Sequence, residues 1–424
     1  MGYTKDFLKG LGWIGAFRYG AKAIVFAKVI IAYRYLTPRE VGLFGLAAIA
    51  LGLLEMLTET GINVVLIKDK KPLSYYLDTA YIVSIIRGVL IGAVLLIFSY
   101  LAPIFFRDDG LFPLLLLAAI IPVIKGFINP AISMYVKDLH FSKEAYLRIG
   151  LTLIDAVSAI ALVQYFHTAQ SLIYAMIVTA FAEVAYSFIW IRQWPKFHFN
   201  KEVYKDIITP GKWINAVGII TYAEQNFDNI IVGRVLGPTA LGFYQTAFNL
   251  TRSLIAEVGT AFSQVLLPIY GRLVDEPERM RRAVIKLVLP AALLMMIPTI
   301  ALNLPIVQRA LIYLLKEKWI PSLELLLPLS LCAFITGMDT LINPLFLARN
   351  WIRSLVMLYA VGLIAMLALM WWFTHAYGLH GAAYAVLASR LLIQPLFIWQ
   401  TIKVAKSKSS HHMNLAELAR VREQ

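Results

Sequence analysis

The chain has 424 residues, of which 60% are hydrophobic and 15% charged, and its mean hydropathy is +0.71. This composition excludes a soluble globular protein, because apolar stretches of about 20 residues, enough to cross ~30 Å of hydrocarbon, recur throughout. The net charge is +14, with 39 basic and 25 acidic residues. Cys332 is the single cysteine, which excludes an internal disulfide and a cysteine metal cluster.

Twelve apolar segments are long enough to cross the membrane, some with length to spare for tilting. In chain order they cover residues 10–36, 41–61, 77–103, 111–135, 147–167, 170–191, 212–236, 239–271, 283–303, 322–346, 351–375 and 379–402. The first is too long for a signal peptide and is expected to remain as a membrane anchor. The predicted fold class is therefore an all-α integral membrane protein.

A repeat divides these segments into two sets of six. RYLTPREVGLFGLA from Arg34 returns as RVLGPTALGFYQTA from Arg234. Identical residues stand 200 positions apart at Arg34 and Arg234, Leu36 and Leu236, Pro38 and Pro238, Gly42 and Gly242, and Ala47 and Ala247. Six spans per set give both sets the same orientation, which predicts a parallel pseudo-twofold repeat about the membrane normal.

Four regions follow from this repeat. They are an N-terminal six-helix lobe over residues 1–191, a cytoplasmic connector over 192–212, a C-terminal six-helix lobe over 213–402 and a cytoplasmic tail over 403–424. Most basic residues fall on one side of the predicted membrane, so the positive-inside rule places both termini in the cytoplasm. The positive charge also predicts attraction to anionic membrane lipid, with no need for nucleic acid. The connector either lies along the inner headgroups or is a solvated linker.

Fourteen charged side chains fall within the predicted spans. Each costs roughly 2.5–3.5 kcal/mol at the bilayer centre and must therefore face protein or water. The basic residues are Arg18, Lys22, Lys28, Arg87, Lys125, Arg252 and Arg390. The acidic residues are Glu55, Asp155, Glu183, Glu224, Asp228, Glu257 and Asp339.

Five of these charges are predicted to form one layer in the N-terminal lobe. Arg18, Arg87, Lys125, Asp155 and Glu183 each lie ~12–15 Å inside the cytoplasmic end of a span, at 1.5 Å per residue. The layer is either an ion-pair network that holds the lobe together or an electropositive wall that receives a phosphate. In the second interpretation Arg18 and Lys22 are the leading candidates, because no acid near them in sequence neutralises them.

The candidate binding residues for an anionic headgroup are Arg18, Lys22, Lys28, Arg87, Lys125 and Arg252. The candidates for ion coupling or gating are Asp155, Glu183, Glu224 and Asp228. The 200-residue offset aligns Lys28 with Asp228, either as a cross-lobe ion pair of one transport state or by coincidence. Arg252 and Glu257 are five residues apart, ~140° round a regular helix, so each is expected to have another partner.

Four segments carry a resemblance to a known family. They are RYLTPREVGLFGLA at Arg34, FDNIIVGRVLGPTALGFYQTA at Phe227, LPIYGRLVDEPERMRRA at Leu267 and LLKEKWIPSLELLLPL at Leu314. The chain resembles oligosaccharide flippases of the polysaccharide transporter (Wzx-like) family, in the multidrug/oligosaccharidyl-lipid/polysaccharide exporter superfamily. The resemblance implies a MATE-like fold of two six-helix bundles around a central cavity.

The resemblance also implies a function. Such a protein would move a polyprenyl-diphosphate-linked oligosaccharide across the cytoplasmic membrane by alternating access, for surface polysaccharide synthesis. A polysaccharide polymerase and glycosyltransferases would be its protein partners. Many relatives carry two further C-terminal helices beyond the twelve expected here.

Two other functions remain open. A multidrug exporter of the same fold would favour acids and aromatic residues around a cationic drug, whereas Arg18, Lys22 and Lys28 favour an anion. A membrane glycosyltransferase or polymerase would need sizeable outer loops with catalytic carboxylates, and the outer turns hold few acids. The chain has no Walker A sequence, so ATP hydrolysis is not expected. We expect no enzymatic activity, because the outer turns hold few acids, and no cofactor. The energy source is left open.

Overall fold

The computed structural model describes residues 20–58, 72–137, 141–191, 193–274 and 276–406, which contain helices and no strand. The first helix runs through residues 20–35. The next elements are α2 (Pro38–Leu57), α4 (Leu73–Phe106), α5 (Leu111–Ala118), α6 (Ile120–Gly126), η1 (Pro130–Ser133), α7 (Met134–Lys137), α8 (Phe141–Phe166) and α9 (Gln170–Ile189). After them come α10 (Lys201–Thr251), η2 (Arg252–Ala256), α11 (Glu257–Arg272), α12 (Pro277–Asn303), α13 (Pro305–Leu315), η3 (Glu317–Trp319), α14 (Ile320–Glu324), α15 (Leu326–Ala348) and α16 (Ile352–Lys406).

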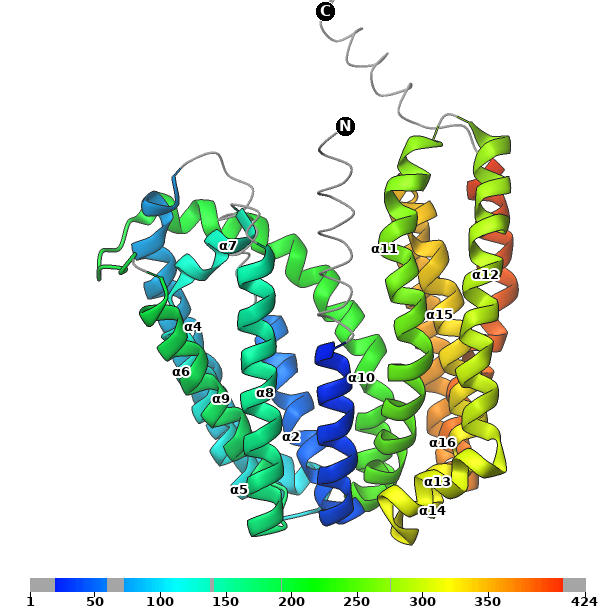
Figure 1. The fold of residues 1–424 in the computed structure, drawn as a ribbon, viewed down its shortest axis with the longest axis horizontal. Coiled ribbons are helices and arrows are strands. Elements are labelled where there is room, and N and C mark those ends of the chain that lie inside the picture. The colour runs from blue at the N-terminus through cyan, green and yellow to red at the C-terminus, as the bar shows by residue number, and fades with distance from the viewer. Residues whose placement is uncertain (1–19, 59–71, 138–140, 192, 275, 407–424) are drawn as a thin grey trace, which may run out of the picture. The chain divides into compact units, whose positions relative to one another are not determined.

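Eight helices in the described ranges are long and apolar enough to cross a membrane (Figure 1). Two of them contain a break at a glycine with positive φ, Gly237 (φ 83°) in α10 and Gly378 (φ 58°) in α16. Dividing both there, and adding the helix over 20–35 and the apolar stretch Leu111–Gly126, gives the twelve spans predicted from the sequence. Glycine adopts positive φ without a steric penalty, which explains where the chain turns.

One predicted span is less regular than expected. The segment 111–135 is divided into α5, α6, η1 and the first turn of α7 rather than forming one helix. Pro122 lies in the first turn of α6 and has no N–H to donate to the carbonyl of Ala118, where α5 ends. The chain therefore re-enters helical geometry after Ala119 instead of continuing without a break.

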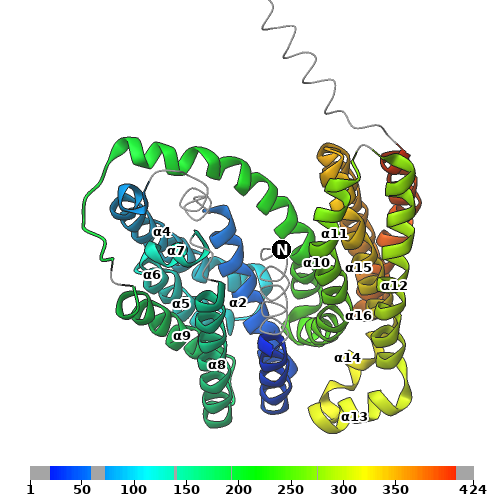
Figure 2. The same cartoon turned by 45° about the horizontal axis from the view of Figure 1, so that its top comes forward.

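The helices group into two compact units. Unit 1 comprises Met1–Asn226 and Gly237–Gly242, and unit 2 comprises Phe227–Leu236 and Phe243–Gln424. Within unit 2, the short helix α13 follows α12 and runs across its direction (Figure 2). The division between the units falls inside α10 and not at the connector 192–212. The predicted division into two lobes, a connector and a tail stays a prediction.

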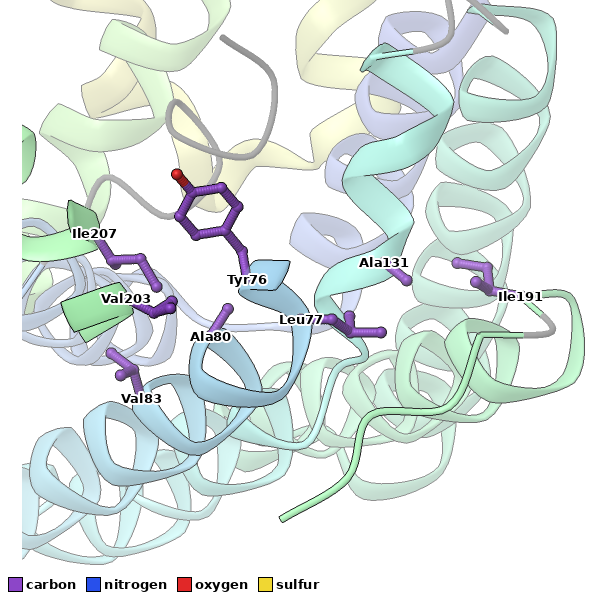
Figure 3. Close-up of a cluster of buried hydrophobic side chains, with 8 residues drawn as sticks. All are labelled: Tyr76, Leu77, Ala80, Val83, Ala131, Ile191, Val203 and Ile207. Carbon is purple, nitrogen blue, oxygen red and sulfur yellow. The ribbon is translucent and has the colours of Figure 1, made fainter. Parts of the chain in front are cut away.

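The extended part of the connector is hydrogen-bonded to unit 1. The Asn129 side chain donates to the carbonyl oxygen of Gln193 (2.8 Å), and the Lys196 amide donates to the Asp78 carboxylate (2.8 Å). From Lys201 the connector is helical, and Val203 and Ile207 are buried in a cluster with residues at the start of α4 (Figure 3). The first turns of α10 are thus packed against protein and are not a solvated linker.

The repeated motif forms a helix start in each copy. In the first, the Thr37 hydroxyl accepts from the Glu40 amide (3.3 Å) and the Glu40 carboxylate accepts from the Thr37 amide (2.8 Å). This capping box, with Pro38 at the first helical position, satisfies N–H groups that have no intrahelical partner. In the second copy, Gly237 replaces Thr37 and breaks α10 immediately before Pro238.

The two copies of the motif touch within unit 1. A Cβ on Gly42 would overlap the carbonyl oxygen of Pro238, and a Cβ on Gly242 would overlap the carbonyl oxygen of Pro38. This reciprocity is that of a local twofold axis, on which each copy presents the same surface to the other. It explains why glycine is present at this position in both copies, and it places both prolines at the same end of the spans, as predicted.

We expect Gly42→Ala and Gly242→Ala each to destabilise the protein, by about 1–3 kcal/mol, because the added methyl group forces two backbones apart. The measurement is the midpoint of thermal unfolding of the purified protein in detergent. The control is Gly150→Ala in α8, where nothing lies within 4 Å of the new Cβ. Equal midpoints for Gly42→Ala and Gly150→Ala would show that the close approach is not a stabilising contact.

Candidate functional site

Charged side chains from three helices of unit 1 meet around Glu55, near the C-terminal end of α2. Its carboxylate lies 3.5 Å from the Lys125 ammonium of α6. The Arg87 guanidinium of α4 donates to the carbonyl oxygen of Glu55 (2.6 Å) and to the hydroxyl of Thr58 (3.2 Å). We call Glu55, Thr58, Arg87 and Lys125 the Glu55 cluster.

Local helix geometry explains why cations gather here. The last carbonyl groups of α2 have no intrahelical donor, and they form the negative end of the helix dipole. Thr58 donates to the Leu54 carbonyl (2.6 Å), while Arg87 donates to that of Glu55. Lys125 likewise lies in the last turn of α6, a position that favours a positive charge.

Two glycines bring the helices of the cations close together. Gly88 and Gly126 directly follow Arg87 and Lys125 in sequence. A Cβ on Gly88 would overlap the Pro122 carbonyl oxygen, and one on Gly126 would lie 3.0 Å from the Ser84 carbonyl oxygen. Since only glycine permits this separation of α4 and α6, both cations are positioned by backbone packing.

The Glu55 cluster has further polar neighbours in unit 1. Glu183 of α9 interacts electrostatically with Lys125, Arg148 and Glu55. Tyr222 of α10 donates to the Ile49 carbonyl (2.7 Å), and its ring lies against Gly52 one turn before Glu55. Lys125 and Arg87 thus both contact Glu55, and Glu183 interacts with Lys125, while the five-residue layer as a whole stays a prediction.

A second ion pair in unit 1 is tighter. The Lys28 ammonium donates to the Asp155 carboxylate at 2.6 Å, and these side chains are 18% and 21% exposed. The pair joins the first helix to α8. Asp155, a member of the predicted layer, is therefore paired with Lys28, which that layer did not include.

The remaining predicted cations are placed as follows. Arg18 lies outside the described residues. Lys22 is exposed on the first helix, one and a half turns before Lys28. Arg252 belongs to unit 2, where its guanidinium lies 5.9 Å from the centre of the Phe248 ring.

The angle predicted between Arg252 and Glu257 is wrong for this structure. Residues Arg252–Ala256 form a π-helical turn, in which residue i bonds to residue i+5. A separation of five residues is then close to one turn, whereas the ~140° value assumed a regular α-helix.

Asp228 forms a buried polar group in unit 2 with Asn229 and Tyr244. Its side chain is 3% exposed, and its carboxylate accepts from the Tyr244 hydroxyl (2.9 Å) and from the Asn229 amide and side chain (2.8 Å each). Arg252 interacts with it electrostatically. Buried carboxylates need such donors, because an unsatisfied one loses its hydration without replacement.

Lys28 and Asp228 both have partners within their own unit. Lys28 pairs with Asp155, and Asp228 with Tyr244 and Asn229. A Lys28–Asp228 pair in another conformation stays a prediction. Glu224, the remaining coupling candidate, lies half-buried in α10, two residues after Tyr222.

Glu55 is the functional candidate that the sequence analysis left out of its site residues. It was counted among the acids within spans, without a role. One signal in the sequence could have identified Glu55 as a candidate. Apart from Glu59 at its end, the predicted span 41–61 contains no other charged residue. In the described ranges, no group of three histidine, cysteine or acidic side chains could hold a metal ion.

Comparison with known proteins gives a family match. The profile of a family described as "Polysaccharide biosynthesis protein" matches residues 30–324, which is more than half of the chain. An "uncharacterized membrane protein in cps region" from Klebsiella pneumoniae is 24% identical over 84% of this chain and 74% of its own length. The lipopolysaccharide biosynthesis protein WzxC of Escherichia coli K12 is 22% identical over 70% of this chain and 62% of its own. The chain thus spans about two thirds to three quarters of these relatives.

Solved structures share the fold. An inward-facing MATE-family multidrug transporter of the MOP superfamily matches with a TM-score of 0.68 at 17% identity, over 91% of this chain and 94% of its own. The lipid II flippase MurJ in an inward closed conformation matches with a TM-score of 0.67 at 13% identity, over 97% and 92%. The predicted MATE-like fold and the resemblance to the Wzx-like group are confirmed.

We expect Asp155→Asn to lower stability by about 2 kcal/mol, because it leaves the Lys28 ammonium without its charged hydrogen-bond partner. The double variant Lys28→Met/Asp155→Leu should recover most of this loss, since apolar residues often replace a paired charge without penalty. Thermal unfolding midpoints in detergent provide the measurement. The control is Glu144→Gln, which breaks the more exposed Glu144–Arg148 pair on α8 and should change stability by at most ~0.5 kcal/mol. A double variant no more stable than Asp155→Asn would contradict a mainly structural role for the pair.

Tyr244→Phe should destabilise the protein by about 1–3 kcal/mol, because it removes a donor from the buried Asp228 carboxylate. Tyr270→Phe is a matched control, since the Tyr270 ring is equally buried and its hydroxyl has no hydrogen-bond partner in the described ranges. We expect that variant to be neutral or more stable. Similar losses in both variants would show that the hydrogen bond to Asp228 contributes nothing specific.

Proposed function

The chain belongs to the family of polysaccharide biosynthesis proteins, and we propose that it is a flippase for polyprenyl-diphosphate-linked oligosaccharides. In this proposal it acts in the cytoplasmic membrane, with both termini in the cytoplasm, and supplies surface polysaccharide synthesis. Glycosyltransferases would deliver its substrate and a polymerase would receive it. The family match supports the polysaccharide pathway, and the fold supports transport.

The observation that carries the proposal is the Glu55 cluster. Arg87 and Lys125 bring two cations from adjacent helices to one residue, Glu55, with Arg87 in a candidate membrane span and Lys125 in the shorter apolar helix Leu111–Gly126. Charges at such depth are expensive and are kept where they serve a function. A diphosphate has several charged oxygens, and guanidinium and ammonium groups bind these through short, charge-assisted hydrogen bonds.

The transport step follows from the two-lobe fold. The diphosphate would bind the cations in a hydrated passage while the prenyl chain stays in lipid. Rocking of the lobes would then expose the passage to the opposite side. Arg18, Lys22, Lys28 and Arg252 are further candidates to guide the anion, and Lys28 would be available only when Asp155 releases it. Asp155, Glu183, Glu224 and Asp228 stay candidates for ion coupling or gating.

We expect Arg87→Ala and Lys125→Ala each to reduce glycan export at least about tenfold, because each removes a charged hydrogen bond worth about 1.5–3 kcal/mol. Export is measured in a strain whose own copy of the gene is deleted, as surface polysaccharide and as lipid-linked glycan accumulating on the cytoplasmic side. Lys286→Ala is the control, because Lys286 is exposed on α12 in unit 2. Protein levels in the membrane are measured in parallel. Full export by the double variant Arg87→Ala/Lys125→Ala, at normal protein level, would contradict the proposal.

A further inference from the structure

Two of the ion pairs of unit 1 differ in strength. Lys28 and Asp155 are 2.6 Å apart and about one fifth exposed, whereas Lys125 and Glu55 are 3.5 Å apart with side chains 38% and 36% exposed. An ion pair of the second kind contributes little, because its attraction is weakened by solvent and its geometry is long. The Lys125–Glu55 contact can therefore be exchanged for a better one at small cost.

The open side of the Glu55 cluster differs from the lipid-facing sides of neighbouring helices. Large apolar residues that are highly exposed occur along α4 and α8, such as Ile97 (65%), Ile104 (76%) and Val157 (65%). On α2, Leu57 alone belongs to this exposed apolar class. The partly exposed carboxylate of Glu55 thus belongs to a helix whose open surface is not built for contact with acyl chains.

Glu55 also contacts both cations with different groups. Its carbonyl oxygen accepts from Arg87, while its carboxylate faces Lys125. Displacing the carboxylate would release the Lys125 ammonium from Glu55, with Glu183 as its remaining acidic neighbour, and would not disturb the hydrogen bond that positions Arg87. Glu55 therefore positions Arg87 through its carbonyl oxygen and pairs reversibly with Lys125 through its carboxylate.

We propose that Glu55 is a built-in competitor for the anion site formed by Arg87 and Lys125. A diphosphate, with several negative charges, displaces the carboxylate from Lys125, whereas an anion of low charge does so poorly. When the substrate leaves, Glu55 returns to Lys125 and lowers the affinity for the departing anion. Glu55 then sets the affinity of the site for its anion, and this inference rests on the proposed function of the same site.

The test is binding of farnesyl diphosphate, a short prenyl diphosphate, to the purified full-length protein in detergent, measured by titration calorimetry. Glu55→Gln keeps the shape of the side chain and removes its charge, and it should bind the probe about five- to tenfold more tightly, a typical size for one coupled interaction. Lys125→Gln should bind more weakly, and adding Glu55→Gln to it should give little further gain. Farnesyl monophosphate should gain by a similar factor, because both probes need the same freed ammonium.

Glu276→Gln is the control for net charge. It also removes one carboxylate, but from an exposed pair with Arg279 at the start of α12, and should leave the affinity unchanged. If Glu55→Gln is poorly folded, Glu55→Asp is used instead, since the shorter side chain lengthens the contact with Lys125 and should also tighten binding.

Unchanged or weaker binding by Glu55→Gln would overturn the inference, and so would an absence of probe binding by both the variant and the unmodified protein. Neither result would by itself overturn the proposed function, which is judged by glycan export. Loss of export in Arg87→Ala and Lys125→Ala with no change in Glu55→Gln binding would leave a flippase without a built-in competitor. Full export by the double alanine variant would reject the proposed function.

Discussion

Charge within membrane-spanning helices is the constraint on which the structure depends. A lone charge in hydrocarbon is too expensive to keep, so each one must have a partner, water or a ligand. In unit 1 the structure meets this constraint in two ways: Lys28 and Asp155 form a short pair, and Lys125 and Glu55 form a long one beside Arg87. The first arrangement suits a permanent link between helices, and the second suits a site whose ligand changes.

Glycine positions make both the repeat and the site possible. Gly42 and Gly242 let the two copies of the motif meet at their proline carbonyl groups. Gly88 and Gly126 do the same for α4 and α6, directly after Arg87 and Lys125 in sequence. In each case the neighbouring backbone occupies the space that a Cβ would fill. The separation of the helices is therefore set by main-chain contact and not by side-chain rotamers. In the proposed function, cations held in this way would be preorganised for the anion, which would lower the entropy lost on binding.

Much of the fold could be predicted from the sequence, and the pairing of charges could not. Span length is a local property, so apolar runs were enough to locate the helices, and the structure then showed breaks at Gly237 and Gly378 between predicted spans. Partners depend on how each helix is rotated against its neighbours, which no local pattern contains. The sequence therefore did not indicate that Lys28 pairs with Asp155, which is 127 residues away. The role of Glu55 likewise depends on its contacts with α4 and α6, which only the structure shows. The π-helical turn at Arg252 likewise alters the angle between Arg252 and Glu257 that a regular α-helix would give.

The central claim is that this chain moves a lipid because that lipid carries a diphosphate. The most direct measurement reconstitutes the purified protein into liposomes and follows translocation of one oligosaccharide on two carriers, a polyprenyl diphosphate and a neutral prenyl ether. We expect translocation of the diphosphate-linked glycan alone, and its loss when Arg87 and Lys125 are both neutralised. Equal translocation of both glycolipids, or transport that survives neutralisation of both cations, would contradict the account.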